Sequence, residues 1–282
     1  MSRGLTVALL LWSLLAQPAA AAEHRYFTTS DGVKLHYIEE GAGRPRTIVF
    51  VPGWTMPAWI WDRQIAHFGR THHVIAFDPR SQGASQIAHA GHEPVRRGRD
   101  IAELIEHLGR ERVLLVGWSL GVLDSLAYVR GAGEGRLAGL VLVDNSIGED
   151  PPPVPTPPSK GAKPLREVAM ASFVRGMFAT PQPEPWLDRL IRSALRTPEP
   201  AANALLAYPV PRTWWKEAVY AVSRPVLYLV RPKFEGQAAN LAARHPTAET
   251  LVLRGPGHAL FIDDPARFHA ALDDFARRRV WQ

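Results

Sequence analysis

The amino-acid sequence predicts an α/β protein built on a mostly parallel sheet of eight strands, flanked by helices. Short runs of apolar and β-branched residues recur along the chain, and amphipathic helical patterns separate them. These runs lack the strict alternation of strands that have one face in water, so helices are expected on both faces of the sheet. A hairpin signal, Asp31-Gly32, lies between the first two runs. With 46% apolar and 21% charged residues among 282, the chain can bury a sizeable core.

The elements follow from these patterns in order. Strands are expected at residues 25–29, 33–39, 47–51, 73–77, 113–117, 137–143, 226–230 and 250–253. Helices are expected between them at residues 60–68, 101–108, 120–130, 237–244 and 265–278. Asp263 and Asp264 are expected to cap the start of the last helix.

Proline interrupts the pattern between the sixth and seventh strands. Fourteen of the 25 prolines lie between Pro151 and Pro211. Residues 151–158 cannot form a helix, because proline lacks the N–H group and restricts the residue before it, so a stiff extended arm is expected. Helical patterns broken by prolines follow at residues 165–178, 186–195, 201–207 and 213–222. The sequence therefore predicts an insertion of small helices.

The N-terminus has the pattern of a secretory signal peptide. Arg3 precedes an apolar run over residues 5–15, and alanines end the segment at Ala22. We expect residues 1–22 to be removed and the protein to be exported to the periplasm or the exterior. No later stretch is long and apolar enough to span a bilayer. The chain has no cysteine, which excludes disulfides, thiol nucleophiles and cysteine metal sites.

The positive charge does not indicate nucleic-acid binding. Lys and Arg number 33 and Asp and Glu 27, a net charge of +6. The basic groups Arg96, Arg97 and Arg99, and residues 277–279, have no interleaved aromatics and are expected on solvated helix faces. We expect a small-molecule partner. No metal or organic cofactor is expected, because the chain has neither a phosphate loop nor a metal-ligand spacing. The sequence does not indicate an oligomeric state.

A serine lies at a turn typical of a nucleophile. Gly117-Trp118-Ser119-Leu120-Gly121 follows a predicted strand and opens a predicted helix, the context that a G-x-S-x-G turn requires. The helix N-terminus favours negative charge developing near the hydroxyl. His258 follows the last predicted strand in Gly257-His258, where a loop at the carboxyl end of the sheet can bring a base to Ser119.

With these residues, and with the turn Asp78-Pro79-Arg80-Ser81-Gln82-Gly83-Ala84-Ser85, the chain resembles the α/β-hydrolase family over nearly its whole mature length. The resemblance implies a core at residues 23–148 and 217–282, with a helical cap at 149–216. It also implies an oxyanion hole formed by the backbone amides of Leu120 and Trp54. Trp54 and Trp118 are expected beside the nucleophile, in an apolar substrate pocket.

The acid of the triad departs from the family pattern. Relatives carry an aspartate shortly after the seventh strand, but here Val226–Val230 is followed by Arg231-Pro232-Lys233-Phe234-Glu235. Asp144, at the end of the sixth strand, is one candidate, because some relatives carry their acid there. Glu235 is the other, and a site without a working acid stays open.

The resemblance implies a serine hydrolase that cleaves a carboxylic ester through Ser119, His258 and an acid, most simply Asp144. The same site could cleave carbon–carbon, lactone or amide bonds, or perform perhydrolysis. A catalytically silent member that binds a small apolar ligand is the alternative from another class.

Overall fold

A computed structural model describes residues 22–154 and 164–282, and its strands form one sheet in the order β1-β2-β4-β3-β5-β6-β7-β8. Only the pairings β1–β2 and β2–β4 are antiparallel, so the predicted mostly parallel eight-stranded sheet is confirmed. The strands are β1 Glu23–Thr28, β2 Lys34–Glu40, β3 Thr47–Val51, β4 His73–Asp78, β5 Val113–Trp118, β6 Leu137–Val143, β7 Val226–Val230 and β8 Ala248–Val252.

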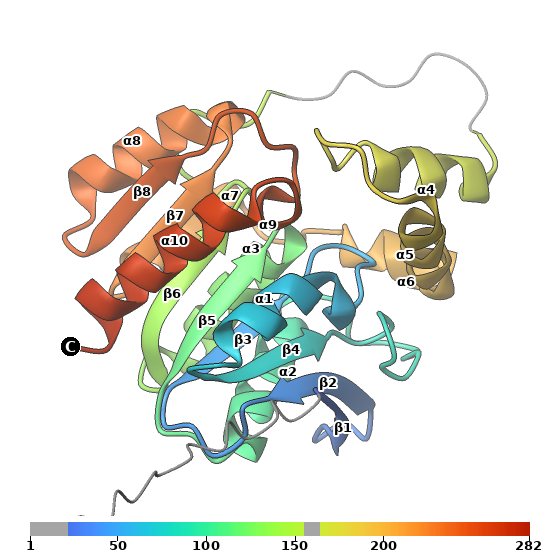
Figure 1. Cartoon of the computed structure of the whole chain (residues 1–282), viewed down its shortest axis with the longest axis horizontal. Helices are drawn as coiled ribbons and strands as arrows, with labels where there is room; N and C mark the ends of the chain where they lie inside the picture. The colour runs from blue at the N-terminus through green and yellow to red at the C-terminus, as the bar shows by residue number, and fades with distance from the viewer. Residues whose placement is uncertain (1–21, 155–163) are drawn as a thin grey trace, which may run out of the picture.

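Helices cover both faces of this sheet (Figure 1). The α-helices are α1 Asp62–Phe68, α2 Pro94–His107, α3 Leu120–Ala132, α4 Arg166–Arg175, α5 Glu184–Arg196, α6 Glu199–Leu205, α7 Arg212–Tyr220, α8 Glu235–Arg244, α9 Leu260–Asp263 and α10 Pro265–Phe275. Helices α2, α3, α7 and α8 contribute to the hydrophobic cluster on one face, and α1 and α10 to the cluster on the other.

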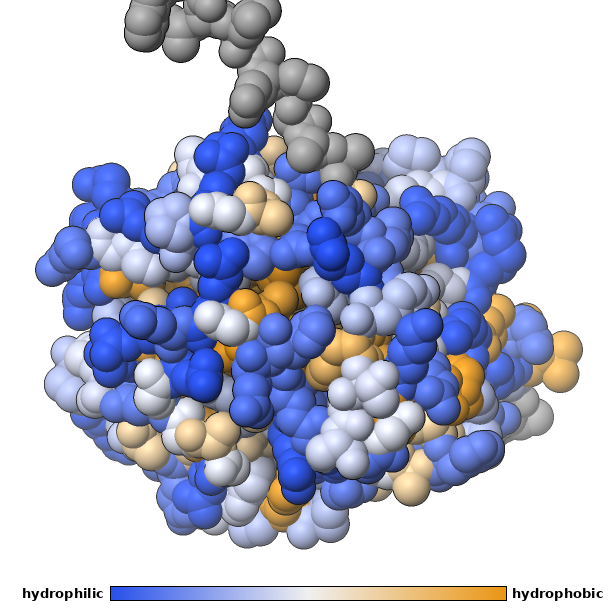
Figure 2. Space-filling view, turned by 90° about the horizontal axis from the view of Figure 1, so that it is seen from below, coloured by the Kyte–Doolittle hydropathy of each residue, from blue (hydrophilic) through white to orange (hydrophobic). Residues whose placement is uncertain are grey.

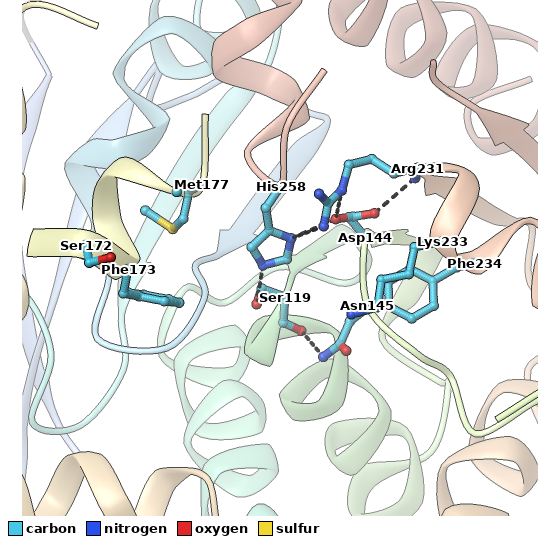
Figure 3. A pocket seen from close by; sticks show the side chains of 11 residues that line it. Ser119, Asp144, Asn145, Ser172, Phe173, Met177, Arg231, Lys233, Phe234 and His258 are labelled. Carbon is cyan, nitrogen blue, oxygen red and sulfur yellow. Dashed lines mark hydrogen bonds and ion pairs between the residues drawn. The ribbon is translucent and has the colours of Figure 1, made fainter. Parts of the chain in front are cut away.

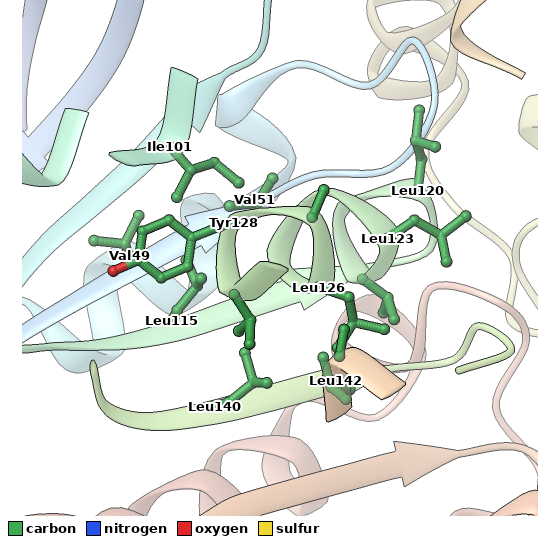
Figure 4. Packing of buried hydrophobic residues seen from close by; sticks show 14 of the residues in the cluster. Val49, Val51, Ile101, Leu115, Leu120, Leu123, Leu126, Tyr128, Leu140 and Leu142 are labelled. Carbon is green, nitrogen blue, oxygen red and sulfur yellow. The ribbon is translucent and has the colours of Figure 1, made fainter. Parts of the chain in front are cut away.

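The central strands explain why the sequence lacked polar alternation. Every residue of β3 is buried, and successive residues point to opposite faces. Val49 and Val51 therefore join the cluster under α2 and α3, whereas Ile48 and Phe50 join the cluster under α1 and α10. Figure 4 shows the first of these clusters around α3. A strand buried on both faces holds its end in a fixed place, which matters for the loops that follow it.

Helix α2 is longer than predicted. It begins at Pro94, not at residue 101, with the proline in the first turn, where its missing N–H is not needed. The first half of α2 buries Arg97, Gly98 and Asp100. Because polar residues lie on this buried face, the sequence does not show the apolar spacing of a helix there. A side chain at Gly98 would approach the backbone of Ala127 to 2.5 Å, so glycine permits the close packing of α2 on α3.

The boundary that we expected for the cap, at residue 216, falls inside α7. Trp215, Ala218 and Val219 of α7 are buried in the cluster around α3. Helix α7 therefore belongs to the layer that covers the sheet. Helices α4, α5 and α6 lie together to one side of the sheet (Figure 1).

Two other predictions fall largely outside the described residues. The predicted signal peptide covers residues 1–22, of which only Ala22 is described, so both the signal peptide and export stay predictions. Most of the proline arm after residue 154 is also outside them, and residues 151–154 are not helical.

The surface is mainly polar. Figure 2 shows charged and polar residues spread over one face of the molecule, with small apolar patches between them. Within residues 22–154 and 164–282, no helix combines the length and the apolar character needed to cross a membrane.

A histidine on α10 helps to support the segment that follows His258. Gln64 of α1 donates hydrogen bonds to the Phe261 carbonyl, at 3.0 Å, and to Nε2 of His269, at 3.2 Å. Nε2 accepts this bond only when the ring is neutral. Burial, and secondarily the nearby His67, lowers the pKa of His269 to about 4.

We predict that His269→Gln makes stability less sensitive to acid. The unfolded chain protonates His269 near 6.5 and the folded chain only near 4, so the unfolded state binds more protons between these values. Stability that is present above pH 6.5 is therefore lost as the pH falls toward 4. The loss is on the order of 1 kcal/mol, after allowance for solvent screening at this half-buried ring. Urea unfolding at neutral and acid pH measures it, and an equal acid loss in both proteins would contradict the prediction.

Candidate active site

Ser119 lies on a strained turn between β5 and α3. Its φ of 54° and ψ of −120° are unusual for a residue with a side chain, and such strain costs on the order of 1–3 kcal/mol. The turn is held by a bond from the Ser119 amide to the Val143 carbonyl, at 2.9 Å, and by one from the Asn145 side-chain amide to the Ser119 carbonyl, at 2.8 Å. These contacts hold the strained backbone against the end of β6.

The two glycines of the serine motif let the chain pack this closely. A Cβ at Gly117 would lie 2.2 Å from the Gly121 carbonyl oxygen. A Cβ at Gly121 would lie 2.4 Å from the Val51 carbonyl oxygen at the end of β3. Any larger residue at either position would push Ser119 away from the neighbouring strand ends.

His258 bridges Ser119 and Asp144. It lies in the loop between β8 and α9, with Nε2 at 2.9 Å from the Ser119 Oγ and Nδ1 at 2.6 Å from Oδ2 of Asp144 (Figure 3). The shorter bond requires a proton on Nδ1, which leaves Nε2 to accept the proton of the serine hydroxyl. The three side chains therefore form one chain of hydrogen bonds.

Asp144 is the candidate acid that contacts His258. It follows β6 with a φ of 50°, and its carboxylate is completely buried. Glu235 forms an ion pair with Arg254 at 2.7 Å and no hydrogen bond with His258. The parallel pairing of β6 with β7 brings the ends of these strands together, and the Asp144 amide donates to the Leu229 carbonyl.

Arg231 also binds Asp144, a contact that the sequence analysis missed. Its backbone amide donates to Oδ1 at 2.9 Å and its Nε donates to Oδ2 at 2.6 Å. Its Nη2 lies 3.4 Å from Nδ1 of His258, but Nδ1 already donates to Asp144, so this approach is not a second hydrogen bond. A buried carboxylate costs several kcal/mol unless it is paired, and Arg231 supplies the pairing. The available signal was an arginine directly after β7, at the start of the segment in which relatives usually carry the acid.

Tyr228 supports the serine turn indirectly, through Asn145. Burial, followed by the charge of Asp144, raises the pKa of Tyr228 well above its ordinary value. The neutral phenol donates to the Asn145 carbonyl at 2.7 Å. Asn145 in turn donates to Ser119, so Tyr228 holds the turn through one intermediate.

Trp118 differs from its expected role. Its side chain is 1% exposed and does not line the cavity at Ser119. Its Nε1 donates to the His258 carbonyl at 2.9 Å, and its ring packs 5.2 Å from the imidazole. We expected a substrate contact, but the pleat of β5 turns this ring inward, where it positions the loop of His258.

The loop after β3 lies against the nucleophile. A Cβ on Gly53 would be 3.0 Å from Cβ of Ser119, so Trp54 follows at the edge of the serine turn. Among the described residues, the amides of Trp54 and Leu120 donate to no other group of the chain. Both amides therefore remain available to a ligand oxygen. The Trp54 ring itself packs edge-on against Phe173 and donates to the Ala202 carbonyl.

Gln82 holds that loop, which is a role that the sequence analysis did not identify. Its Oε1 accepts from the Thr55 amide at 2.7 Å, and its Nε2 donates to the carbonyls of Gly53 and Met56. Gln82 belongs to the family-like turn after β4 and is buried. The presence of a glutamine in that turn was the only signal that the sequence offered.

Asp263 joins the helical insertion to the loop of His258. Its carboxylate accepts from the amides of Gly257, at 2.6 Å, and Ala179, at 2.8 Å. Asp264 caps α10 by accepting from the Arg267 amide, as expected. The expectation that Asp263 shares this cap is wrong, because its side chain turns toward the insertion.

A cavity of about 440 Å³ opens at Ser119. Residues of α4 form one side, and residues that follow β7 form the other (Figure 3). Its lining is Ser119, Asp144, Asn145, Ser172, Phe173, Gly176, Met177, Arg231, Lys233, Phe234 and His258. In the part of the chain that the structure describes, no cluster of His, Asp or Glu has the arrangement of a metal site.

Comparison with known proteins gives the family. A model of the alpha/beta hydrolase family matches residues 48–271. A non-heme haloperoxidase from Rhodococcus erythropolis is 39% identical over 129 residues, which are 45% of this chain and 44% of that protein. A bifunctional esterase/perhydrolase from Acinetobacter calcoaceticus is 33% identical over 105 residues, 37% of this chain and 38% of that one. The chain thus matches less than half the length of these relatives.

A solved structure agrees on the fold. An esterase from Rhodococcus sp. ECU1013 superposes with a TM-score of 0.78 at 23% identity, over 91% of this chain and 99% of that chain. At this identity the likeness shows the fold alone. Since the family model covers most of the chain and carries the serine turn and the histidine loop, the chain belongs to the alpha/beta hydrolase family.

Proposed function

We propose that this protein is a serine hydrolase that cleaves a carboxylic ester of a small molecule through an acyl-enzyme. The observation that carries the proposal is the unbroken series of contacts from the Ser119 Oγ through His258 to Asp144, at 2.9 and 2.6 Å. Both distances are within the range that proton transfer requires. The cavity of about 440 Å³ at Ser119 is in the usual range for a small ligand.

In the first half of the reaction, Ser119 Oγ attacks the ester carbonyl while His258 Nε2 takes the hydroxyl proton. The protonated imidazole then gives that proton to the leaving alkoxide, and the acyl group remains on Ser119. In the second half, His258 takes a proton from water as the water oxygen attacks the acyl carbonyl. The protonated imidazole then returns this proton to the Ser119 Oγ as the bond between serine and acyl group breaks, and the acid product leaves. In both halves Asp144 accepts a hydrogen bond from the Nδ1–H group of His258. Its negative charge stabilises the imidazole ring when that ring carries a second proton.

The negative charge on the carbonyl oxygen needs donors that are already in place. We assign this role to the amides of Leu120, at the N-terminus of α3, and Trp54, beside Ser119. Each such donor contributes roughly 3 kcal/mol to the stabilisation of a tetrahedral intermediate. Gln82 supports the second donor by holding the neighbouring Thr55 amide at 2.7 Å.

Perhydrolysis is the second candidate, supported by relatives described as a non-heme haloperoxidase and an esterase/perhydrolase. In this reaction hydrogen peroxide, instead of water, attacks the acyl-enzyme. His258 takes a proton from the peroxide as the peroxide oxygen attacks the acyl carbonyl, and returns it to the Ser119 Oγ as the bond between serine and acyl group breaks. A peroxycarboxylic acid then leaves in place of the carboxylic acid. The step uses the same Ser119, His258 and Asp144.

We predict that a fluorophosphonate probe labels Ser119 and that Asp144→Asn lowers kcat for a 4-nitrophenyl ester by roughly 10⁴-fold. The loss follows because asparagine can no longer stabilise the charged imidazole. Glu235→Gln is the matched control and should stay within about twofold, since Glu235 forms only an exposed ion pair. No Ser119-dependent labelling of the folded protein would reject the serine mechanism and favour a silent ligand-binding member. The reverse ranking of the two acids would reject Asp144.

Hydrogen peroxide should divert the acyl-enzyme if the second candidate is correct. We predict peracid formation from an acetate ester in the presence of peroxide, measured by bromide oxidation and lost in Ser119→Ala. Ester hydrolysis without any Ser119-dependent peracid would exclude perhydrolysis and leave the esterase proposal intact.

Arg231 is a positioning residue in this mechanism. We predict that Arg231→Met lowers kcat for a neutral ester by about 10- to 100-fold, because Asp144 loses a charged hydrogen bond. KM should change little, and Arg231→Lys should recover part of kcat by restoring the charge. Unchanged kcat in Arg231→Met, with thermal unfolding unaltered, would contradict the assignment.

A further inference from the structure

The cavity at Ser119 has one cationic side. Arg231 and Lys233, which follow β7, both line it (Figure 3). Phe173 of α4 and Met177, which follows this helix, lie on the opposite side of His258 in the same view. The substrate space therefore has an apolar wall and a positively charged wall, with the nucleophile between them.

Lys233 has no acidic partner in the protein. All 27 Asp and Glu residues lie within the described parts of the chain, because residues 1–21 and 155–163 contain none. None of them forms an ion pair with Lys233, whose Nζ lies 5.4 Å from the centroid of the Phe234 ring. The nearest acid in sequence, Glu235, is bound to Arg254 at 2.7 Å. Lys233 therefore presents an uncompensated charge at the cavity.

Arg231 neutralises the acid of the triad and still has a donor to spare. Its Nε and backbone amide bind Asp144, but its Nη1 donates to no group among residues 22–154 and 164–282. Asp144 is the only carboxylate in the lining of the cavity. Arg231 and Lys233 carry two positive charges and Asp144 carries one negative charge. The wall therefore has a net charge of +1 when His258 is neutral.

We propose that the ester substrate carries an anionic group, such as a second carboxylate, which binds Lys233 and Nη1 of Arg231. This inference rests on the proposed esterase function and assigns its substrate class. The apolar part of the substrate packs on Phe173 and Met177, and the scissile carbonyl lies at Ser119. A carboxylate on this side would satisfy the two donors and balance the charge of the wall.

Matched esters that differ only in charge test the proposal. On the acyl side the pair is monoethyl adipate and ethyl hexanoate, and on the alcohol side it is 4-acetoxyphenylacetate and 4-methylphenyl acetate. Hydrolysis at neutral pH is followed with a pH-stat, and kcat/KM for the anionic ester is divided by that for its neutral twin. Because each variant is compared on the same pair, differences in intrinsic reactivity cancel.

We expect Lys233→Met to lower this ratio by about tenfold for at least one pair, while kcat/KM for the neutral twin stays within about twofold. Lys233→Glu should lower the ratio further. Lys34→Met is the matched control, since Lys34 lies on β2 over the Tyr26 ring and should leave the ratio unchanged. In the wild-type protein the ratio should also fall as salt is added, which a purely structural role of Lys233 would not produce.

An unchanged ratio in Lys233→Met for both pairs would overturn the inference, even if both esters are hydrolysed. If none of the four esters is hydrolysed, the proposed esterase function fails independently of the charge inference. Calorimetric binding of the esters to Ser119→Ala then still decides whether the site prefers an anionic ligand. Monoethyl adipate should then bind more tightly than ethyl hexanoate, and Lys233→Met should remove the difference. Equal binding of the two esters to Ser119→Ala would reject the anionic site.

Discussion

The buried carboxylate of Asp144 is the constraint on which the rest of the site depends. It lies directly after β6, whose last five residues are all buried, at a place where an unpaired charge would cost several kcal/mol. His258 and Arg231 provide the pairing, and each comes from the end of another strand or from the loop after it. Burial therefore forces three separate segments to meet at one point. The ring orientation that a general base needs is a consequence of this electrostatic requirement.

Strain at Ser119 is sustained by the same arrangement. The positive φ of this residue is held by the Val143 carbonyl, directly before Asp144, and by Asn145, directly after it. Tyr228 of the next strand holds Asn145. The segment from Val143 to Asn145 thus binds the nucleophile with its backbone and an amide, and the histidine with its carboxylate. Two reacting groups placed by one rigid segment need little reorganisation before reaction.

The sequence was informative where the signal is local. Ser119 could be found because a strand, a turn with glycines and a helix follow one another within a few residues, and His258 because it follows a strand. The acid could not be settled, since Asp144 and Glu235 are separated in sequence and only the register of β6 against β7 brings one of them to His258. The role of Gln82 was missed and that of Asp263 was misassigned for the same reason: Thr55 and Ala179, whose amides these side chains bind, are more than 20 residues away in the chain.

The position of the acid also explains the charge of the cavity. In the pattern usual among relatives, an aspartate a few residues after the seventh strand supplies the carboxylate that orients the histidine. Here Asp144 approaches from β6, so the segment after β7 is released from that role and must instead compensate a buried negative charge. Arg231 does so with two of its donors and keeps a third toward the cavity, and Lys233 adds a charge that no acid of the chain balances. With the acid at the end of β6, the segment after β7 therefore gives its side of the cavity a positive charge.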